Sequence, residues 1–415
     1  MASALEHPSL GTWDPESAIA SIGMALQPAS GARDLNPQQV EHNQILRVRL
    51  AEVYRQWGYD EVSPPQVERM DTLKAGGGIN SADIVRLVAD EPLGLRPEMT
   101  ASIARAATTR LAQRSRPLRL WSSGTVFESR MNDEGAQRIE EKLYSGVELF
   151  GSGQVHGELE LLSLLMASFE ALQLQPGHQA RLLVGHAALM QLMLAPFEEP
   201  GRDLIKQALV SFDRLDLETL NISPQQRDRL QQQLDLRGEP HAVIEQLRRQ
   251  FGPQPVLSEL ERLFTHLQPL AQDLGVSLQL DPSFQPHFEL YDGLVIQLVC
   301  QGHSAPVVVA RGGRYDRVLK RFGAQGTDAA GLGFGICLDD IRDLPSAHHP
   351  ERSDSERVLV AYGESASLEA ALQQQRRLHQ AGTAAVVELN PLSDQEEAES
   401  FCNERGCSSV HWIDV

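Results

Sequence analysis

Residues 93–106 read LGLRPEMTASIARA, and residues 123–151 read SGTVFESRMNDEGAQRIEEKLYSGVELFG. The first stretch holds an Arg-Pro-Glu cluster whose proline stands where proline suits the first turn of a helix. The Ala-rich segment 99–111 is evenly amphipathic, which predicts a helix packed on one face. The second stretch predicts a pair of strands, the latter ending in an apolar run. Together the two stretches predict a fold that combines helices with a sheet.

The composition is that of an ordinary soluble globular protein, with 415 residues, of which 41% are hydrophobic and 22% charged. A chain of this length accommodates two or three domains. Its formal net charge of −19 is unfavourable for gripping a nucleic acid, because neutralisation of phosphates supplies most of that affinity. The charge therefore argues against tRNA as a partner, although a local basic patch would fit within an acidic chain.

The scatter of the four cysteines favours reduced thiols over a disulfide framework, and their spacing is not that of a metal site. They are Cys300, Cys337, Cys402 and Cys407. We expect no bound metal. The first 25 residues lack a sustained apolar run, and no stretch approaches the roughly 18 apolar residues of a membrane span. We therefore expect a cytoplasmic protein without membrane contact.

Composition and pattern divide the chain into six segments. Residues 1–28 are expected to form a disordered extension, within which Met24 is an alternative start. The later segments are the first half of a core at 29–176, a mostly helical insertion at 177–274, the second half of the core at 275–344, a linker at 345–356 and a small α/β domain at 357–415. The last segment alternates strand and helix, which predicts a small parallel sheet.

The segment ahead of the Arg-Pro-Glu cluster predicts a long helix that leads into a strand. Apolar side chains recur at helical spacing over residues 40–57, and Gly58 is a suitable helix stop. Residues 59–67 are expected to be extended, with two prolines inside the segment. A helix followed by a proline-bearing strand is common and is weak evidence alone. Its position ahead of the Arg-Pro-Glu cluster makes this pattern more informative.

Taken in order, these motifs resemble the signature motifs of histidyl-tRNA synthetases. The resemblance rests on RPE-x-T at 96–100, GVELFG at 146–151, GGRYD at 312–316 and GLGFGICLDDI at 331–341. It implies an α+β fold: a class II aminoacyl-tRNA synthetase-like antiparallel sheet core with flanking helices, a helical insertion and a small C-terminal α/β domain. That last domain resembles a truncated anticodon-binding domain. The first helix and strand form the dimer interface in that family, which implies self-association here.

In the resembled family, three arginines hold the ATP polyphosphate, where negative charge must be stabilised during activation of the amino acid. The corresponding positions here are Glu128, Pro286 and Asp340, or His287 if the second alignment slips by one residue. A carboxylate about 4 Å from a phosphate oxygen costs about 4 kcal/mol of repulsion at an effective dielectric of ~20. The resemblance therefore implies a chain without catalytic residues of its own and without a cofactor.

The amino-acid side of the resembled site is better preserved. The family's histidine contacts correspond here to Glu98, Tyr144, Glu148, Tyr291 and Tyr315, with Tyr144 in place of a glutamine. Carboxylates pair with an ammonium or an imidazole N–H, and tyrosine hydroxyls satisfy either ring nitrogen. Two interpretations stay open: a pocket that retains L-histidine, or a set of core hydrogen bonders in a scaffold that binds nothing. The larger ring of Tyr144 would favour the second if it fills the slot.

The regulatory subunits of ATP phosphoribosyltransferase resemble histidyl-tRNA synthetase over the core and lack the catalytic arginines. Resemblance to them implies a non-catalytic partner of a short-form catalytic subunit, required for the first step of L-histidine biosynthesis and mediating feedback by histidine. Two alternatives stay open: an active histidyl-tRNA synthetase with displaced catalytic groups, and a synthetase-like RNA-binding or sensor protein. The acidity of the chain and its short tail argue against both.

Overall fold

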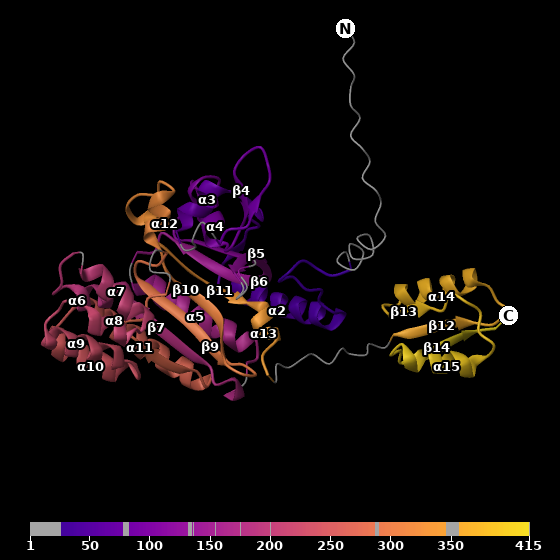
Figure 1. Ribbon diagram of the computed structural model, residues 1–415. Helices are drawn as coiled ribbons and strands as arrows, with labels where there is room; N and C mark the ends of the chain where they lie inside the picture. Colours follow the sequence, from indigo (N-terminus) through magenta and orange to yellow (C-terminus); the bar gives the residue numbers. More distant parts are fainter. Residues whose placement is uncertain are drawn as a thin grey trace, which may run out of the picture. The chain divides into compact units, whose positions relative to one another are not determined.

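The computed structural model describes the chain from residue 26 to 414, except for residues 78–82, 132–134, 136, 154, 175, 200, 287–289 and 346–356. The chain divides into two compact units, Met1–Ala347 and His348–Val415 (Figure 1). The expected extension at 1–28, with Met24, and the expected linker at 345–356 lie almost wholly outside the described residues.

The first unit is built on an eight-stranded sheet in the order β1-β5-β6-β11-β10-β9-β7-β8. The strands are β1 (Asp60–Glu61), β5 (Leu118–Met131), β6 (Gln137–Phe150), β7 (Arg181–His186), β8 (Ser277–Leu280), β9 (Leu294–Gln301), β10 (Pro306–Arg314) and β11 (Gly331–Cys337). The inner strands pair antiparallel, but β1 is parallel to β5 and β8 is parallel to β7. The sheet is therefore mixed and not wholly antiparallel as expected, because long helical connections separate the partners of both edge pairs.

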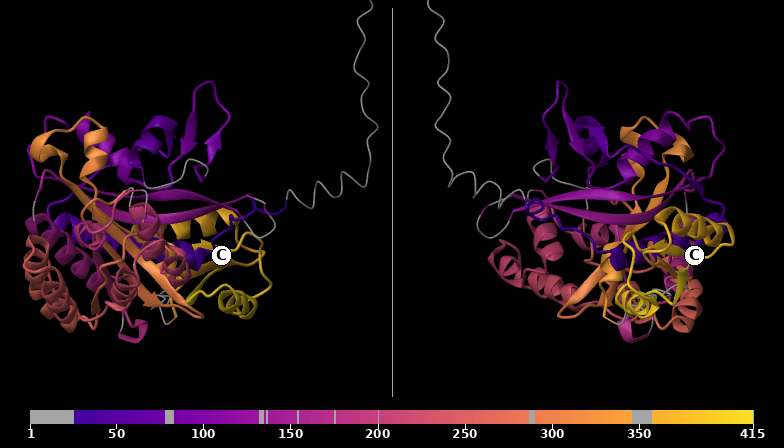
Figure 2. Two further views of the ribbon diagram at one scale, coloured as in Figure 1. Left: turned by 60° about the vertical axis from the view of Figure 1, so that its left-hand side comes forward. Right: turned by 90° about the vertical axis from the view of Figure 1, so that its right-hand side faces the viewer.

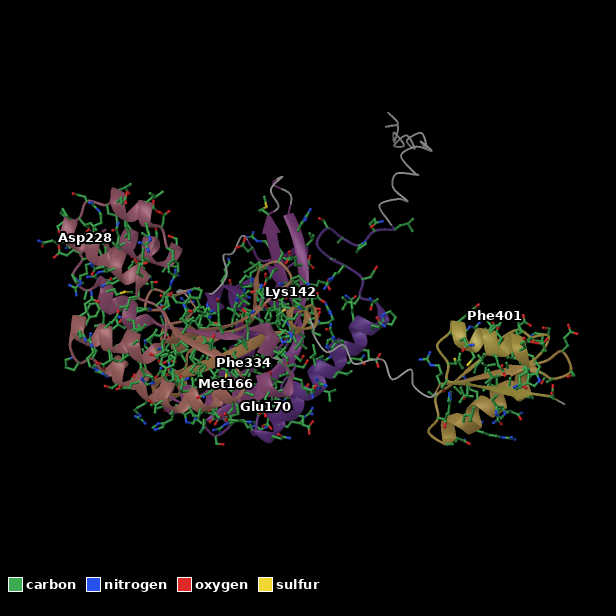
Figure 3. The ribbon with its side chains drawn as sticks, turned by 90° about the horizontal axis from the view of Figure 1, so that it is seen from below. Lys142, Met166, Glu170, Asp228, Phe334 and Phe401 are labelled. Atoms are coloured by element: carbon green, nitrogen blue, oxygen red, sulfur yellow. The ribbon has the colours of Figure 1, made fainter. Side chains whose placement is uncertain are left out.

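The two faces of this sheet bury different cores. Leu120 and Phe150 belong to one cluster of buried side chains, whereas Trp121 and Leu149 belong to the other. This follows from the alternation of side chains along a strand. Helices α2 (Pro37–Gln56), α5 (Val155–Ala171), α10 (Pro240–Phe251) and α11 (Pro255–Asp273) contribute to the larger core, and α4 (Thr100–Thr108) and α12 (Asp316–Arg321) to the smaller. Figure 3 shows Met166 and Phe334 inside the larger core and Glu170 at its edge.

Helix α2 ends just before Gly58, as predicted, and begins three residues ahead of the apolar pattern. Asn36 and Gln39 form a capping box, Pro37 occupies the first turn, and Gly58 follows the helix with a positive φ of 77°. The segment after it is less regular than expected. Only Asp60–Glu61 forms a strand before β2 (Val67–Arg69), because the intervening prolines cannot donate to a ladder.

The long hairpin of β5 and β6 extends beyond its neighbours in the sheet (Figure 2). Residues 144–150 of β6 pair with both β5 and β11, whereas residues 137–143 pair with β5 alone. Beside the hairpin, β2 joins β4 (Leu93–Leu95) and β3 (Arg86–Leu87) in a separate small sheet. Helix α3 (Met70–Gly76) lies between β2 and β3 in the sequence, and α4 follows β4. The Arg-Pro-Glu cluster therefore lies between this small sheet and the main one.

The segment expected as a helical insertion, 177–274, begins with a strand of the main sheet, β7. Its helices then divide between two cores. Helices α10 and α11 pack on the main sheet, whereas α6 (Ala187–Leu194), α7 (Gly201–Ser211), α8 (Arg214–Thr219) and α9 (Pro224–Asp235) bury a cluster of their own. Short 3-10 turns, η1 (Pro176–His178) and η2 (Gly326–Ala329), precede β7 and β11.

The second unit is a small α/β fold with the predicted alternation. Its elements are β12 (Val358–Tyr362), α14 (Leu368–Gln380), β13 (Ala385–Val387), α15 (Gln395–Glu404) and β14 (Ser409–Ile413). The strands form a parallel sheet in the order β13-β12-β14. Helix-bearing crossovers between parallel strands are what the alternating pattern predicts.

Helix α13 (Leu338–Arg342) is tied to α2 by a buried guanidinium. Arg342 is only 1% exposed, donates to Asn43 Oδ1 at 3.0 Å, and pairs with Asp339 and with Asp343, the latter at 2.8 Å. Arg342→Met should therefore lower the free energy of unfolding by about 3 kcal/mol, because it leaves a largely buried carboxylate without its partner.

Urea denaturation measures this loss, and Arg214→Met is the matched control. Arg214 pairs with Asp235 at the surface, where both side chains are at least half exposed. Loss of such a pair should change the stability by less than about 1 kcal/mol. Equal losses in the two variants would show that the buried network does not join the helices as described.

Candidate ligand pocket

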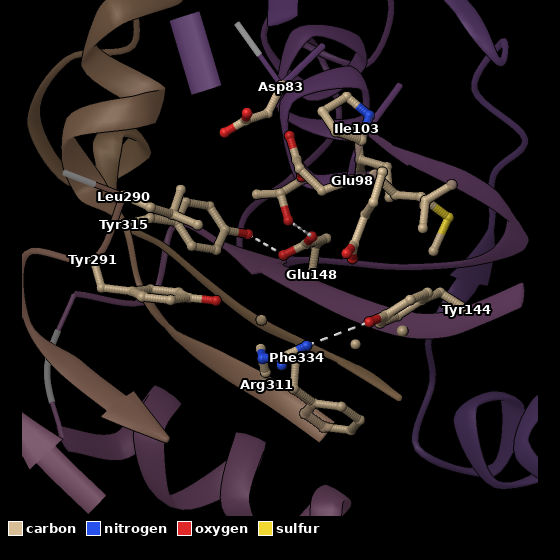
Figure 4. Close-up of a pocket in the computed structure, with 18 of the residues that line it drawn as sticks. Asp83, Glu98, Ile103, Tyr144, Glu148, Leu290, Tyr291, Arg311, Tyr315 and Phe334 are labelled. Carbon is tan, nitrogen blue, oxygen red and sulfur yellow. Dashed lines mark hydrogen bonds between the residues drawn. The ribbon is translucent and has the colours of Figure 1, made fainter. Parts of the chain in front are cut away.

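A cavity of about 350 Å³ opens on the α4 side of the main sheet (Figure 4). All the residues expected to contact histidine line it: Glu98, Tyr144, Glu148, Tyr291 and Tyr315. They come from the turn before α4, from β6, and from the segments that flank β9 and β10. Pockets of small ligands have volumes of roughly 300–1,000 Å³, so the cavity has the size of a small-molecule site.

The Arg-Pro-Glu cluster fixes one wall of the cavity. Arg96 is buried and donates to the carbonyl oxygens of Thr125, at 2.9 Å, and Pro64, at 2.8 Å. Glu98 accepts the backbone N–H of Ala101 at 3.0 Å, which caps α4. Burial raises the pKa of the Glu98 carboxyl group. Because Glu98 has this structural role as well, Glu98→Gln is a cleaner probe of ligand contact than Glu98→Ala.

Glu148 lies at the centre of the cavity wall and is 5% exposed. Thr100 donates to its Oε1 at 2.7 Å, and the hydroxyl of Tyr315 donates to its Oε2. Burial raises the pKa of Glu148 to about 8. Among the described residues, no cationic side chain lies within ion-pair distance of this carboxyl group. A cationic group of a ligand would therefore supply the counter-charge that this buried acid lacks.

The tyrosines differ in what their hydroxyls contact. Tyr315 is bonded to Glu148, whereas the Tyr291 hydroxyl points into the cavity in Figure 4 and has no hydrogen-bond partner in the described part of the chain. The Tyr144 ring lies against Gly335, where an added Cβ would meet it at 3.4 Å. Tyr144 thus lines the cavity and leaves it open, so its larger ring does not occupy the whole slot.

Glycines form part of the cavity wall beside Glu148. Gly333 is in register with Glu148 across the β6–β11 pair, and a Cβ there would lie 1.9 Å from Glu148 Oε2. Gly335 and Gly146 lie two residues further along the same strands, in register with each other, and also line the cavity. The absence of side chains at these positions leaves room for the carboxyl group and for a ligand.

The positions that correspond to the family's arginines do not converge on the cavity. Glu128 lines it, but Pro286 and Asp340 do not, and His287 lies outside the described residues. Asp340 pairs with Lys142 at 3.5 Å. The pKa of Tyr144 is raised by burial and further by the charges of Glu128 and Asp340, which places both carboxylates near its ring. The positive charge of Arg311 opposes this rise, so the charges around Tyr144 are mixed.

Four polar lining residues were not singled out from the sequence: Asp83, Thr100, Ser129 and Arg311. Thr100 belongs to the RPE-x-T run, and its hydroxyl holds the carboxyl group of Glu148 by a hydrogen bond. Arg311 was not singled out, although a charged residue inside the apolar strand VVVARGGR was a signal for a site. Asp83 lies five residues after the glycine run 76–78 and carried no local signal.

The raised pKa of Glu148 predicts that the stability of the ligand-free protein depends on pH. Below about pH 4.5 the group is protonated in both states; between 4.5 and 8 the unfolded chain ionises it while the native state retains the proton. Native stability should therefore fall as pH rises through this window, by at most about 1.4 kcal/mol per pH unit from this group.

Urea denaturation at pH 5, 6.5 and 8 measures this slope, and Glu148→Gln supplies the comparison because an amide does not titrate. The variant should show a shallower decline than the unmodified protein. An unchanged slope would mean that Glu148 is ionised in the native state across the range.

Comparison with known proteins places these features in a family. The family model described as Histidyl-tRNA synthetase matches residues 31–341. The ATP phosphoribosyltransferase regulatory subunit of Prochlorococcus marinus (strain MIT 9313) is 61% identical over 391 residues, which cover 94% of this chain and 100% of that protein. The chain belongs to the ATP phosphoribosyltransferase regulatory subunit family. The regulatory subunit of Synechococcus sp. (strain WH7803) is 59% identical, with the same shares covered.

Solved structures agree with this regulatory-subunit family on the fold. An ATP phosphoribosyltransferase regulatory subunit/histidyl-tRNA synthetase from Bacillus halodurans C superimposes with a TM-score of 0.77 at 23% identity, covering 94% of this chain and 98% of that one. Histidyl-tRNA synthetase from Nostoc sp. PCC 7120 gives 0.71 at 18% identity, covering 94% and 92%. The fold is thus the class II synthetase-like α+β fold. Within the described residues of this family member, no helix has the length and apolar character to cross a membrane.

Proposed function

We propose that the chain is a non-catalytic subunit that acts with a short-form ATP phosphoribosyltransferase catalytic subunit in the cytoplasm, in the first step of L-histidine biosynthesis. The names of its relatives support this role. We further propose that the cavity binds L-histidine and thereby regulates the complex. The observation that carries this second part is Glu148, a buried carboxyl group with two hydroxyl donors and no cationic partner among the described residues.

Histidine offers donors for the buried carboxyl groups of this cavity. Its ammonium and imidazole N–H donors match the carboxyl groups of Glu98 and Glu148. The hydroxyls of Tyr291 and Tyr315 provide further donors and acceptors for the ring. If the ligand binds one conformation of the assembled complex more tightly than another, the difference in binding free energy shifts the population of active complexes.

Glu128 opposes binding of a nucleotide beside the amino acid. Glu128 lines the cavity, and Asp340 lies close enough to influence the same tyrosine. A polyphosphate would meet a carboxylate at Glu128 where the resembled family has an arginine, so we propose that the chain neither activates an amino acid with ATP nor charges tRNA.

Self-association is part of the same proposal and involves α2. Val40 and Val48 stand on this helix with 40% and 65% of their surfaces exposed, and they are eight positions apart, on one side of the helix. We propose that this side, with the adjoining strand segment, forms the contact between two copies of the chain.

Titration calorimetry of the purified chain with L-histidine tests the ligand directly. We expect saturable binding by the wild-type chain at one site per chain, and no comparable signal with L-leucine, whose side chain carries no N–H donor. Equal signals with the two amino acids, or none with L-histidine, would contradict the pocket assignment.

A further inference from the structure

Arg311 lines the cavity from the same face of the sheet as Glu148, but from β10 instead of β6. It stands in β10 in register with Gly335 of β11, which in turn is in register with Gly146 of β6. Residues in register share a face of a sheet, so Arg311 lies on the cavity side. Because neither glycine has a side chain, the guanidinium group has free space above the strands. Figure 4 shows it across the cavity from Glu148, with the hydroxyls of Tyr144 and Tyr291 nearby.

The guanidinium group of Arg311 has few partners within the protein. Its Nη1 donates to the Tyr144 hydroxyl at 3.5 Å, a long hydrogen bond. Its Nε is buried and has no acceptor, and among the described residues no carboxylate lies within ion-pair distance. A guanidinium group is always charged and carries five N–H donors in a planar fork. Within the part of the chain that the structure describes, most of these donors have no acceptor.

The neighbouring buried arginine shows the contrast. Arg314, at the end of the same strand, pairs with Glu158 at 3.0 Å and with Asp316 at 3.3 Å. The described residues thus compensate its charge, whereas they do not compensate that of Arg311. Burial raises the pKa of both Tyr144 and Tyr291, and the positive charge of Arg311 opposes the rise at each, so the guanidinium group acts on both hydroxyls.

We propose that Arg311 binds the α-carboxylate of the amino acid ligand, at the end of the cavity opposite Glu98 and Glu148. The inference rests on the proposed histidine site and deepens it. A planar carboxylate accepts two parallel N–H bonds from a guanidinium fork, which is the strongest pairing available to both groups. The cavity then has a cationic end and an acidic end, and this arrangement selects a zwitterion of defined orientation over an amine or an acid alone.

The test compares L-histidine with histamine, which has the same ring and amine but no carboxylate. Titration calorimetry is run on the wild-type chain and on Arg311→Met, which keeps much of the side-chain length without the charge. The wild type should bind L-histidine about 50-fold more tightly than histamine. Arg311→Met should lose most of this preference by weakening L-histidine alone, with histamine affinity unchanged. Arg311→Lys should retain part of the preference, since a lysine keeps the charge but not the fork.

The outcomes separate the two proposals. If wild type binds both ligands equally, or if Arg311→Met weakens both by the same factor, the role of Arg311 is wrong and the histidine site stands. If the wild type binds another L-amino acid instead, with the same dependence on Arg311 and the carboxylate, the role of Arg311 stands and histidine is the wrong ligand. Failure to bind any proteinogenic L-amino acid would overturn both. The comparison of the two ligands on wild type needs no variant, so it holds even if Arg311→Met does not fold.

Discussion

Replacement of Glu148 by Gln should weaken the binding of L-histidine by about 100-fold or more, because truncating one side of a buried charge pair costs roughly 2–5 kcal/mol. Glu148 is 5% exposed and holds its orientation through Thr100 and Tyr315. The amide has nearly the same shape but carries no charge to pair with the ligand, and its NH₂ group faces donors where the carboxylate accepted. The expected effect is on binding and not on folding.

The matched control is Glu170→Gln on the exposed surface of α5. It removes the same charge from the chain without touching the cavity, so L-histidine affinity should stay within about twofold, as expected of a surface substitution. Thermal denaturation at pH 8 should show Glu148→Gln to be at least as stable as the wild type, because the amide removes an acid that burial holds protonated up to about pH 8. Unaltered L-histidine affinity in Glu148→Gln would remove Glu148 from the site.

Gly333→Ala should damage both the site and the sheet. The added Cβ would lie 1.9 Å from Glu148 Oε2 and 2.4 Å from the carbonyl oxygen of Val147. The carboxyl group can rotate away only by giving up its bond from Tyr315, and the backbone contact forces the β6–β11 pair apart. We expect a loss of about 3 kcal/mol in the free energy of unfolding, at the upper end for an overpacked site, and no detectable L-histidine binding.

Gly201→Ala controls for the change of residue type. Gly201 begins α7, and nothing lies within 4 Å of the position that a Cβ would take. Alanine is the better helix former, so this variant should be as stable as wild type or slightly more so. Wild-type stability and binding in Gly333→Ala would show that the wall of the cavity is not packed as the structure describes.

The sequence predicts much of the site because its signals are local. The RPE cluster does precede a helix, and Glu98 accepts an N–H of its first turn. Helix α4 begins only at Thr100, however, so Pro97 lies before the helix and not in its first turn as predicted. The alternation along a strand puts Tyr144 and Glu148, four residues apart, on one face. The resemblance then relates these residues to two distant tyrosines, Tyr291 and Tyr315, and the structure brings all four together around one cavity.

Other features depend on pairings between distant segments, which local patterns do not contain. The parallel partners of β5 and β7 are decided by how the connecting helices pack. Asp340 turns out to pair with Lys142, almost two hundred residues away in the chain. The position of Arg311 in the cavity depends on Gly335 and Gly146, which lie on two other strands. Because these residues have no side chains, space is left beside them for the guanidinium group.

The measurement that tests the central proposal most directly is the rate of phosphoribosyl transfer from phosphoribosyl pyrophosphate to ATP by a short-form catalytic subunit, with and without this chain. We predict strong activation on mixing and inhibition of the mixed complex by L-histidine, with Glu148→Gln activating equally but responding weakly to L-histidine. No change in rate, together with separate elution of the two chains on gel filtration, would contradict the assignment as a regulatory subunit.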